Sequence, residues 1–218
     1  MRYHEQLFQQ REGAILAAAR QLFCERSWDR VTIAEVAIQA AIGKGTVYKH
    51  FPSKEALYAK LALNLSRDNL AELQALYTSH PPQESMRLVI RQAFEQMLAD
   101  PVLVQLCQHC DRPAFQERLD APYREQFLQL EHDYIAFFGQ LLKATLGEHP
   151  LSSADCQHLL WGVEACFNGV MARIASGGFE HWAEPIALSD YFDRVTDFII
   201  AGLRGQAEAL CGLAASQE

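Results

Sequence analysis

The sequence predicts an all-α protein, made of a three-helix head at the N-terminus and a larger helical body. Apolar residues recur at spacings of three and four along most of the chain, which is typical of amphipathic helices. No segment sustains the alternation of apolar and polar residues that marks a half-buried strand. Proline and glycine residues interrupt the helical pattern at intervals, so we expect several separate helices.

Composition excludes several other classes of protein. Half of the 218 residues are hydrophobic and 21% are charged, enough apolar material to form a core and too much for a disordered chain. The longest stretch without a charged residue runs over 73–83, whereas a membrane-spanning helix needs roughly 20 apolar residues. Charged residues precede the first apolar run, so no signal peptide is expected. We therefore expect a cytoplasmic protein without a membrane anchor, whose six cysteines are reduced thiols.

The head is predicted from three short helical patterns. The first helix begins within the first dozen residues and has an apolar face made of Ile15, Ala18, Ala19, Leu22 and Phe23. It ends at the sequence Ser-Trp-Asp over 27–29. Thr32 and Glu35 then have the spacing of a capping box, which starts a short helix over 33–40. Gly43 and Gly45 mark the break before the next helix, over about 44–51.

The body is predicted as a series of longer helices. Ser53 is suited to cap a helix from Lys54 to about Tyr77. Further helical patterns extend over about 84–99, 102–110, 115–146, 153–176 and 189–210. We expect residues 1–52 to form one domain and residues 53–218 to form the other.

The two short helices over 33–40 and 44–51 have the spacing of a helix-turn-helix unit, whose second helix enters the major groove of DNA. Gly45 would let the backbone approach a phosphate, and Val47 and Phe51 would anchor the inner face, with Tyr48 partly in the core as well. The same helix offers several hydrogen-bond donors to DNA: Lys44, Thr46, Tyr48, Lys49 and His50.

The distribution of charge along the chain agrees with a DNA-binding head. The whole chain has a net charge of −8. Residues 1–60 nevertheless hold nine lysines or arginines against six acidic residues, a net +3, and the rest of the chain is acidic. Lys54, at the start of the next helix, would add a cation where a helix N-terminus already favours a phosphate. Chance clustering of charges is the alternative interpretation.

Residues 32–57, TIAEVAIQAAIGKGTVYKHFPSKEAL, resemble the DNA-binding segment of the TetR family of bacterial transcriptional regulators. The resemblance implies a homodimer in which each head binds an operator half-site and each body holds a ligand pocket. It also implies that Thr32 contacts a phosphate, that Lys44, Thr46, Tyr48 and His50 lie on the recognition helix, and that Lys54 clamps a phosphate. With Gly45, and with Lys49 added from its chemistry, these residues are the predicted DNA-binding set. The sequence departs from the family at Ala41, where glycine is frequent, and at Gly43, where a small hydroxyl residue is frequent.

Two patterns in the body predict its assembly. Small residues recur along one face of the helix over 153–176, at Gly162, Ala165, Gly169 and Ala172, and would let another helix approach closely. The last helix carries an apolar face that includes Tyr191, Val195, Phe198 and Gly202. We expect the two helices to form a four-helix dimer interface with their copies in a second subunit. Packing within one chain is the alternative.

Aromatic and apolar residues of the body are candidates for a ligand pocket. The predicted lining is Met97, Phe127, Tyr134, Trp161, Cys166 and Phe167, which would suit a small hydrophobic or aromatic effector. The alternative is that any one of these residues belongs to the hydrophobic core and does not line a pocket. We expect a ligand-responsive repressor that is released from its operator by this effector, without catalytic activity and without a cofactor or metal.

The sequence around Cys107, His109 and Cys110 leaves other functions open. Two cysteines three positions apart share a helix face, so they could belong to a metal or redox sensor, or to the site of a small α-helical enzyme. A structural zinc site needs four ligands, and no second Cys-x-x-Cys is present. Packing thiols are the favoured interpretation of this cluster.

Overall fold

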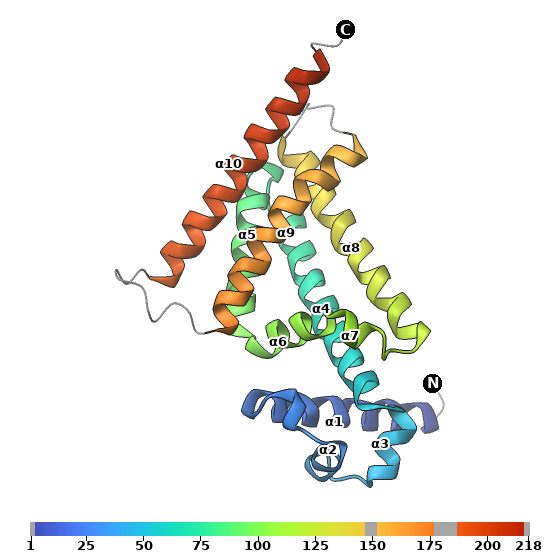
Figure 1. The fold of residues 1–218 in the computed structure, drawn as a ribbon. Helices are drawn as coiled ribbons and strands as arrows, with labels where there is room; N and C mark the ends of the chain where they lie inside the picture. Colours follow the sequence, from blue (N-terminus) through green and yellow to red (C-terminus); the bar gives the residue numbers. More distant parts are fainter. Residues whose placement is uncertain (1–2, 147–151, 177–186, 216–218) are drawn as a thin grey trace. The chain divides into compact units, whose positions relative to one another are not determined.

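The computed structural model describes residues 3–146, 152–176 and 187–215, and all regular elements within these ranges are helical (Figure 1). This confirms the predicted all-α fold. The elements are α1 (Tyr3–Glu25), η1 (Trp28–Arg30), α2 (Ile33–Gln39), α3 (Lys44–His50), α4 (Lys54–Thr78), α5 (Pro82–Ala99), α6 (Pro101–Cys110), α7 (Pro113–Gln116), α8 (Ala121–Leu146), α9 (Ser153–Ala175) and α10 (Leu188–Ala215).

One predicted helix is wrong in extent. The pattern over 115–146 is divided between α7 and α8, with a break over residues 117–120. Pro122 lies in the first turn of α8, where its missing N–H costs nothing. Within a continuous helix the same proline would remove a backbone hydrogen bond and clash with the carbonyl of Arg118. The helix therefore ends before Pro122 and a new one begins.

The helices group into two compact units. The first contains residues 1–66 and 101–127, and the second contains residues 67–100 and 128–218. The first unit thus includes the start of α4 together with α6 and α7, in addition to the three helices of the predicted head. The functional division at residues 52 and 53 stays a prediction, because compactness does not report which residues bind DNA or ligand.

The first unit is built around a continuous apolar core. The five residues predicted for the inner face of α1 are all buried. Phe51 and Tyr58 are among the largest fully buried side chains of this core. Residues of α6 and α7, including Leu106 and Phe115, belong to the same core. The helix-turn-helix therefore does not depend on its own short helices for stability, since it packs on α1 and the start of α4.

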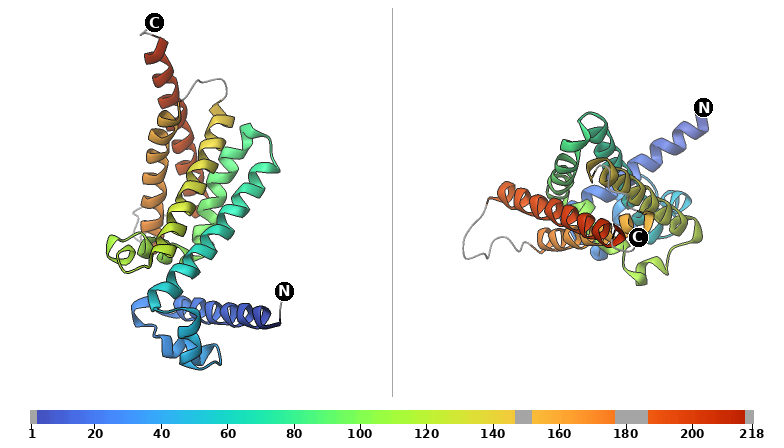
Figure 2. Two further views of the ribbon diagram at one scale, coloured as in Figure 1. Left: turned by 90° about the vertical axis from the view of Figure 1, so that its right-hand side faces the viewer. Right: turned by 90° about the horizontal axis from the view of Figure 1, so that it is seen from above.

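The second unit is a bundle in which α5, α9 and α10 contact one another (Figure 2). Phe94 of α5 lies at its centre. Its ring stacks on Phe167 of α9, with centroids 4.5 Å apart, and on Phe192 of α10, with centroids 5.5 Å apart. Among the described residues, no helix is both long enough and apolar enough to cross a membrane.

Candidate nucleic-acid interface

The start of α2 has the predicted capping box. The Thr32 hydroxyl accepts a hydrogen bond from the Glu35 backbone N–H at 3.2 Å, and the Thr32 N–H donates to the Glu35 carboxylate at 2.8 Å. The Thr32 hydroxyl also donates to this carboxylate, at 2.8 Å. Both donors of Thr32 are therefore directed at Glu35, and a DNA phosphate would have to compete with that carboxylate for them.

Arg26 forms an ion pair with the same Glu35 carboxylate. Its guanidinium donates to Glu35 at 2.8 Å. Together with the two hydrogen bonds from Thr32, this contact lowers the pKa of Glu35 to about 2. Glu35 thus stays ionised at neutral pH, and the charged Arg26 is held beside the first turn of α2.

The turn between α2 and α3 contains a backbone conformation that disfavours alanine. Ala41 has a φ of +54°, in the left-handed region. The Ile42 N–H donates to the Ala37 carbonyl at 3.0 Å, so the turn is closed by a backbone hydrogen bond around this residue. Glycine, which is frequent at this position in the TetR family, adopts this region without penalty. The alanine is accommodated at a cost in conformational energy.

Ala41→Gly should therefore stabilise the protein, by about 1 kcal/mol, because glycine avoids the clash between Cβ and backbone. Urea unfolding of the full chain measures this change. Ala40→Gly is the matched control, since Ala40 has a right-handed conformation, with φ −78°, and glycine there should not stabilise. Equal effects of the two substitutions would contradict the prediction.

The recognition helix α3 has a buried face and an exposed face. Val47 of α3 and Phe51, which directly follows α3, are buried in the core. Lys44, Gly45, Tyr48 and Lys49 are exposed, and Thr46 and His50 are half-buried. Tyr48 is 45% exposed, so the expectation that it lies partly in the core with Phe51 is wrong: residues 47 and 51, four apart, already fill the inner face. The exposed face groups the predicted DNA-contacting side chains of α3.

Two features of this exposed face suit a polyanion. The Lys44 ammonium lies 6.0 Å from the centroid of the Tyr48 ring, so a cation and an aromatic ring are neighbours. A Cβ added at Gly45 would meet no atom within 4 Å, so packing within the chain does not explain the glycine. A close approach of a DNA backbone to α3 would explain why this position is a glycine.

Lys54, the first residue of α4, contacts residues of its own chain. Its ammonium donates to the Asp29 carbonyl at 3.3 Å and lies 4.7 Å from the centroid of the Trp28 ring. Burial lowers the pKa of Lys54, and the nearby carboxylates of Asp29 and Glu55 oppose the shift. The predicted phosphate clamp is therefore also part of the packing between η1 and α4.

None of the six residues predicted to bind a ligand lines the two cavities described below. Phe127 belongs to the first unit and packs on its core. In the second unit, Phe167 stacks on Phe94, the Tyr134 hydroxyl donates to the Asn69 side chain at 2.9 Å, and Trp161 is 58% exposed. Met97 and Cys166 are half-buried.

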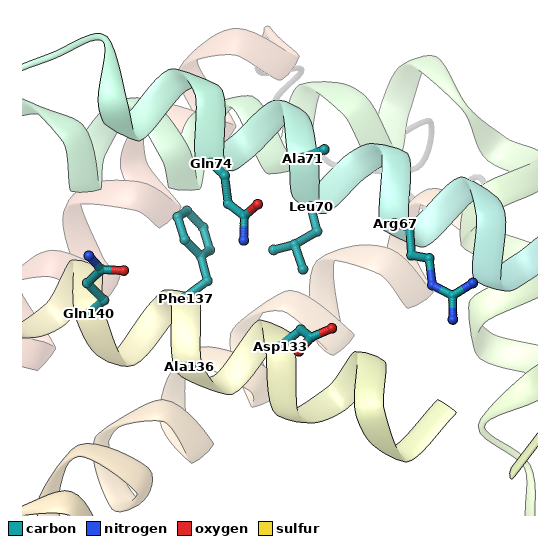
Figure 3. Close-up of a pocket in the computed structure, with 8 residues that line it drawn as sticks. All are labelled: Arg67, Leu70, Ala71, Gln74, Asp133, Ala136, Phe137 and Gln140. Atoms are coloured by element: carbon teal, nitrogen blue, oxygen red, sulfur yellow. The ribbon is translucent and has the colours of Figure 1, made fainter. Parts of the chain in front are cut away.

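The cavities found in the second unit are lined by other residues. A groove of about 330 Å³ lies between α4 and α8, with Leu70 and Phe137 pointing into the space between the two helices (Figure 3). Its other lining residues are Arg67, Ala71, Gln74, Asp133, Ala136 and Gln140. A much smaller cavity, about 10 Å³, is lined by apolar residues that include Met86, Phe138 and Leu203. The aromatic stripe on α8 predicted a lining but could not show which of its members face a cavity.

Comparisons with known proteins agree with the geometry of the head. Residues 15–61 match the family described as bacterial regulatory proteins, tetR family. The chain is 28% identical to the transcriptional repressor BepR of Brucella suis over 208 residues, which cover 89% of this chain and 92% of BepR. Residues 15–61 therefore form a domain of the TetR family. It is 30% identical to the regulator TtgR of Pseudomonas putida over 94 residues, 42% of this chain and 45% of TtgR.

Solved structures show that the TetR-type fold extends over most of the chain. The fatty acid degradation regulator FadR of Bacillus subtilis, solved with stearoyl-CoA, is 16% identical, with a TM-score of 0.60 over 87% of this chain and 97% of FadR. The regulator PfmR of Thermus thermophilus is 17% identical, with a TM-score of 0.60 over 87% of this chain and 98% of PfmR. The chain is thus a helix-turn-helix transcriptional regulator with a helical body.

The surroundings of Cys107, His109 and Cys110 fit the interpretation that these side chains serve packing. Cys110 is buried, and burial raises the pKa of its thiol, so the thiolate needed for metal binding or redox chemistry is disfavoured. The Cys107 thiol lies 3.5 Å from the Ser66 hydroxyl, and the His109 ring packs on Trp28, with centroids 3.8 Å apart. Among the residues that the structure describes, no group of three His, Cys, Asp or Glu side chains could hold a metal ion.

Two contacts at the interface are not predicted by the sequence. They are the ion pair between Arg26 and Glu35, and the packing of the Phe8 ring on His50, with centroids 4.0 Å apart. Phe8 lies before residue 15, where the match to the TetR family begins. Neither pair has the spacing of three or four residues that marks neighbours on one helix, so no local pattern indicates them.

Proposed function

We propose that this TetR-family regulator is a cytoplasmic homodimer without catalytic activity, which represses transcription by binding double-stranded operator DNA and leaves the DNA when a small hydrophobic or aromatic molecule binds. The exposed face of α3 carries the proposal. It presents Lys44, Tyr48 and Lys49 to solvent, while Val47 holds the helix in the core. Such a helix can enter a major groove without unfolding the head.

Repression is favoured over activation by the extent of one match. BepR, which is matched over nearly its whole length, is named a repressor. The activator FasR of Mycolicibacterium smegmatis is 32% identical over 88 residues, 40% of its length. The longer match supports repression, although a shared DNA-binding head is compatible with either outcome.

The proposed dimer uses the faces of α9 and α10 that a single chain leaves exposed. A Cβ added at Gly162, Gly169 or Gly202 would meet no atom within 4 Å. On the same helices, Phe198 is 70% exposed and Trp161 is exposed as well. Large apolar side chains beside bare helix backbone suit close packing against a second copy. Two-fold pairing would also present two recognition helices to a palindromic operator.

The effector is proposed to bind in the second unit. Its apolar interior contains stacked aromatic rings, among them Phe94 and Phe167, and such surroundings favour an apolar or aromatic ligand. FadR, a structural neighbour, was solved with stearoyl-CoA, which has a long apolar chain. Met97, Tyr134 and Cys166 remain proposed contacts, whereas the exposed Trp161 belongs to the proposed dimer face and Phe127 to the first unit.

Fluorescence anisotropy with DNA from upstream of the protein's own gene tests the DNA-binding part. We expect saturable binding that weakens as salt increases, and Lys49→Ala should make the salt slope shallower by about one for each phosphate that the lysine neutralises. Lys143→Ala, at an exposed position in the last turn of α8, removes the same charge away from the head and should leave the slope unchanged. If Lys49→Ala and Lys143→Ala had the same salt slope, Lys49 would not contact a phosphate and the DNA would bind to another surface.

The same assay tests the effector. A compound that copurifies with the protein would be extracted, identified by mass spectrometry and added back to the stripped protein. Because an effector acts only through its different affinity for two arrangements, operator affinity should fall by about 5- to 150-fold. Unchanged affinity at saturating compound would leave a DNA-binding protein but refute gating by that ligand.

A further inference from the structure

His50, the last residue of α3, has its ring packed on a residue of α1. The ring packs on Phe8, with an angle of 30° between the two planes, and its Nδ1 atom is buried without a hydrogen-bond partner. With Nδ1 enclosed, Nε2 is the ring nitrogen available to a ligand on the exposed side of α3. A neutral imidazole carries a single N–H, on one of the two nitrogens.

The surroundings favour the neutral ring with its proton on Nε2. Burial lowers the pKa of His50, and the Arg11 guanidinium lowers it further, against the opposing effect of the Glu12 carboxylate. The charge of Glu12 is shared with Lys60 of α4, whose ammonium lies 3.9 Å away. A proton on Nδ1 would leave a buried N–H without an acceptor, which proteins avoid. The Nε2–H is then a hydrogen-bond donor for DNA.

Phe8 has no evident role other than covering this ring. It is 47% exposed, so it contributes little to the core on which α1 packs. It lies in the second turn of α1, before the segment that matches the TetR family. Figure 1 shows this end of α1 near α3, and both belong to the first unit. The first turns of α1, which precede the matched segment, therefore bring an aromatic ring to the end of the recognition helix.

We propose that Phe8 is a positioning residue of the DNA interface, which holds the His50 ring so that Nε2 faces the DNA. The role in DNA binding rests on the proposed function, whereas the placement of the ring is a property of the free protein. A residue outside the helix-turn-helix thus adjusts one contact of the recognition helix. Two experiments test separately the placement of the His50 ring in the free protein and its role in DNA binding.

The first experiment is an NMR pH titration of His50 in the full-length protein without DNA, with the resonance assigned from its loss in His50→Gln. Wild-type His50 should titrate below the ordinary histidine value of 6.5. Phe8→Ala should raise the titration midpoint by exposing the ring, and Phe8→Tyr, which keeps an aromatic ring, should restore the wild-type value. If Phe8→Ala does not fold, Phe8→Gln tests the same loss with a residue that favours helix. An unchanged midpoint in the folded ringless variant would overturn the proposal.

The second experiment is a double-mutant cycle on operator affinity. Phe8→Ala alone should weaken binding about tenfold, the effect of one specific contact. In the His50→Gln background it should have no further effect, because the ring that it positions is gone. Additive losses would show that Phe8 acts independently of His50 and would overturn the proposal. If the wild type binds no operator, the proposed function fails, and the titration alone then decides whether Phe8 positions His50.

Discussion

Gly169→Leu should convert the protein to a monomer and lower its operator affinity by about 10²- to 10⁴-fold, because binding through one head loses the effective concentration that a linked second head provides. In the single chain, a Cβ at Gly169 would meet no atom within 4 Å. The described part of the subunit thus leaves space at this position, and we expect the leucine to collide with a helix of a second subunit. In a two-fold interface each substitution acts twice, and overpacking costs about 1–3 kcal/mol at each site.

Sedimentation velocity and operator titration measure the two effects. The matched control is Gly139→Leu on α8, where an added Cβ also meets no atom within 4 Å but where no interface is proposed. This control should remain dimeric and bind operator normally. A dimeric, well-folded Gly169→Leu variant would remove this face of α9 from the interface.

Phe51→Ala should destabilise the protein, whereas Tyr48→Ala should weaken operator binding without destabilising it, although the two residues are three positions apart. Phe51 is 1% exposed, so its truncation leaves a cavity in the core of the head and should cost about 3–5 kcal/mol of stability. Operator binding should be lost with it, because α3 loses its anchor. Tyr48 is largely on the surface, so its truncation should leave stability within about 0.5 kcal/mol while weakening operator binding about tenfold or more.

Urea unfolding and anisotropy, measured on the same preparations, distinguish the two outcomes. Tyr48→Phe is the control that separates the hydroxyl from the ring: it should retain stability and lose only the hydrogen bond to DNA. If Tyr48→Ala unfolded as readily as Phe51→Ala, Tyr48 would belong to the core and the exposed face of α3 would not be the DNA surface.

The sequence alone determined those features that depend on neighbours along one helix. The capping box of Thr32 and Glu35, and the anchoring pair Val47 and Phe51, are separated by three and four residues, and the structure has both. These contacts are local, so spacing and residue type are sufficient to predict them. The resemblance of residues 32–57 to the TetR family followed from the same short segment, and the comparisons confirm it.

Only the tertiary structure decided which partners meet across different elements. Phe8 packs on His50, 42 positions away, and Arg26 pairs with Glu35 across η1. Residues that the sequence placed in one ligand site can also lie in different surroundings. Phe127 packs in the first unit and Trp161 lies on the surface, although both belong to aromatic patterns with helical spacing. Periodicity establishes that a helix has an apolar face, but whether that face meets a core, a ligand or another subunit depends on packing that no local pattern contains.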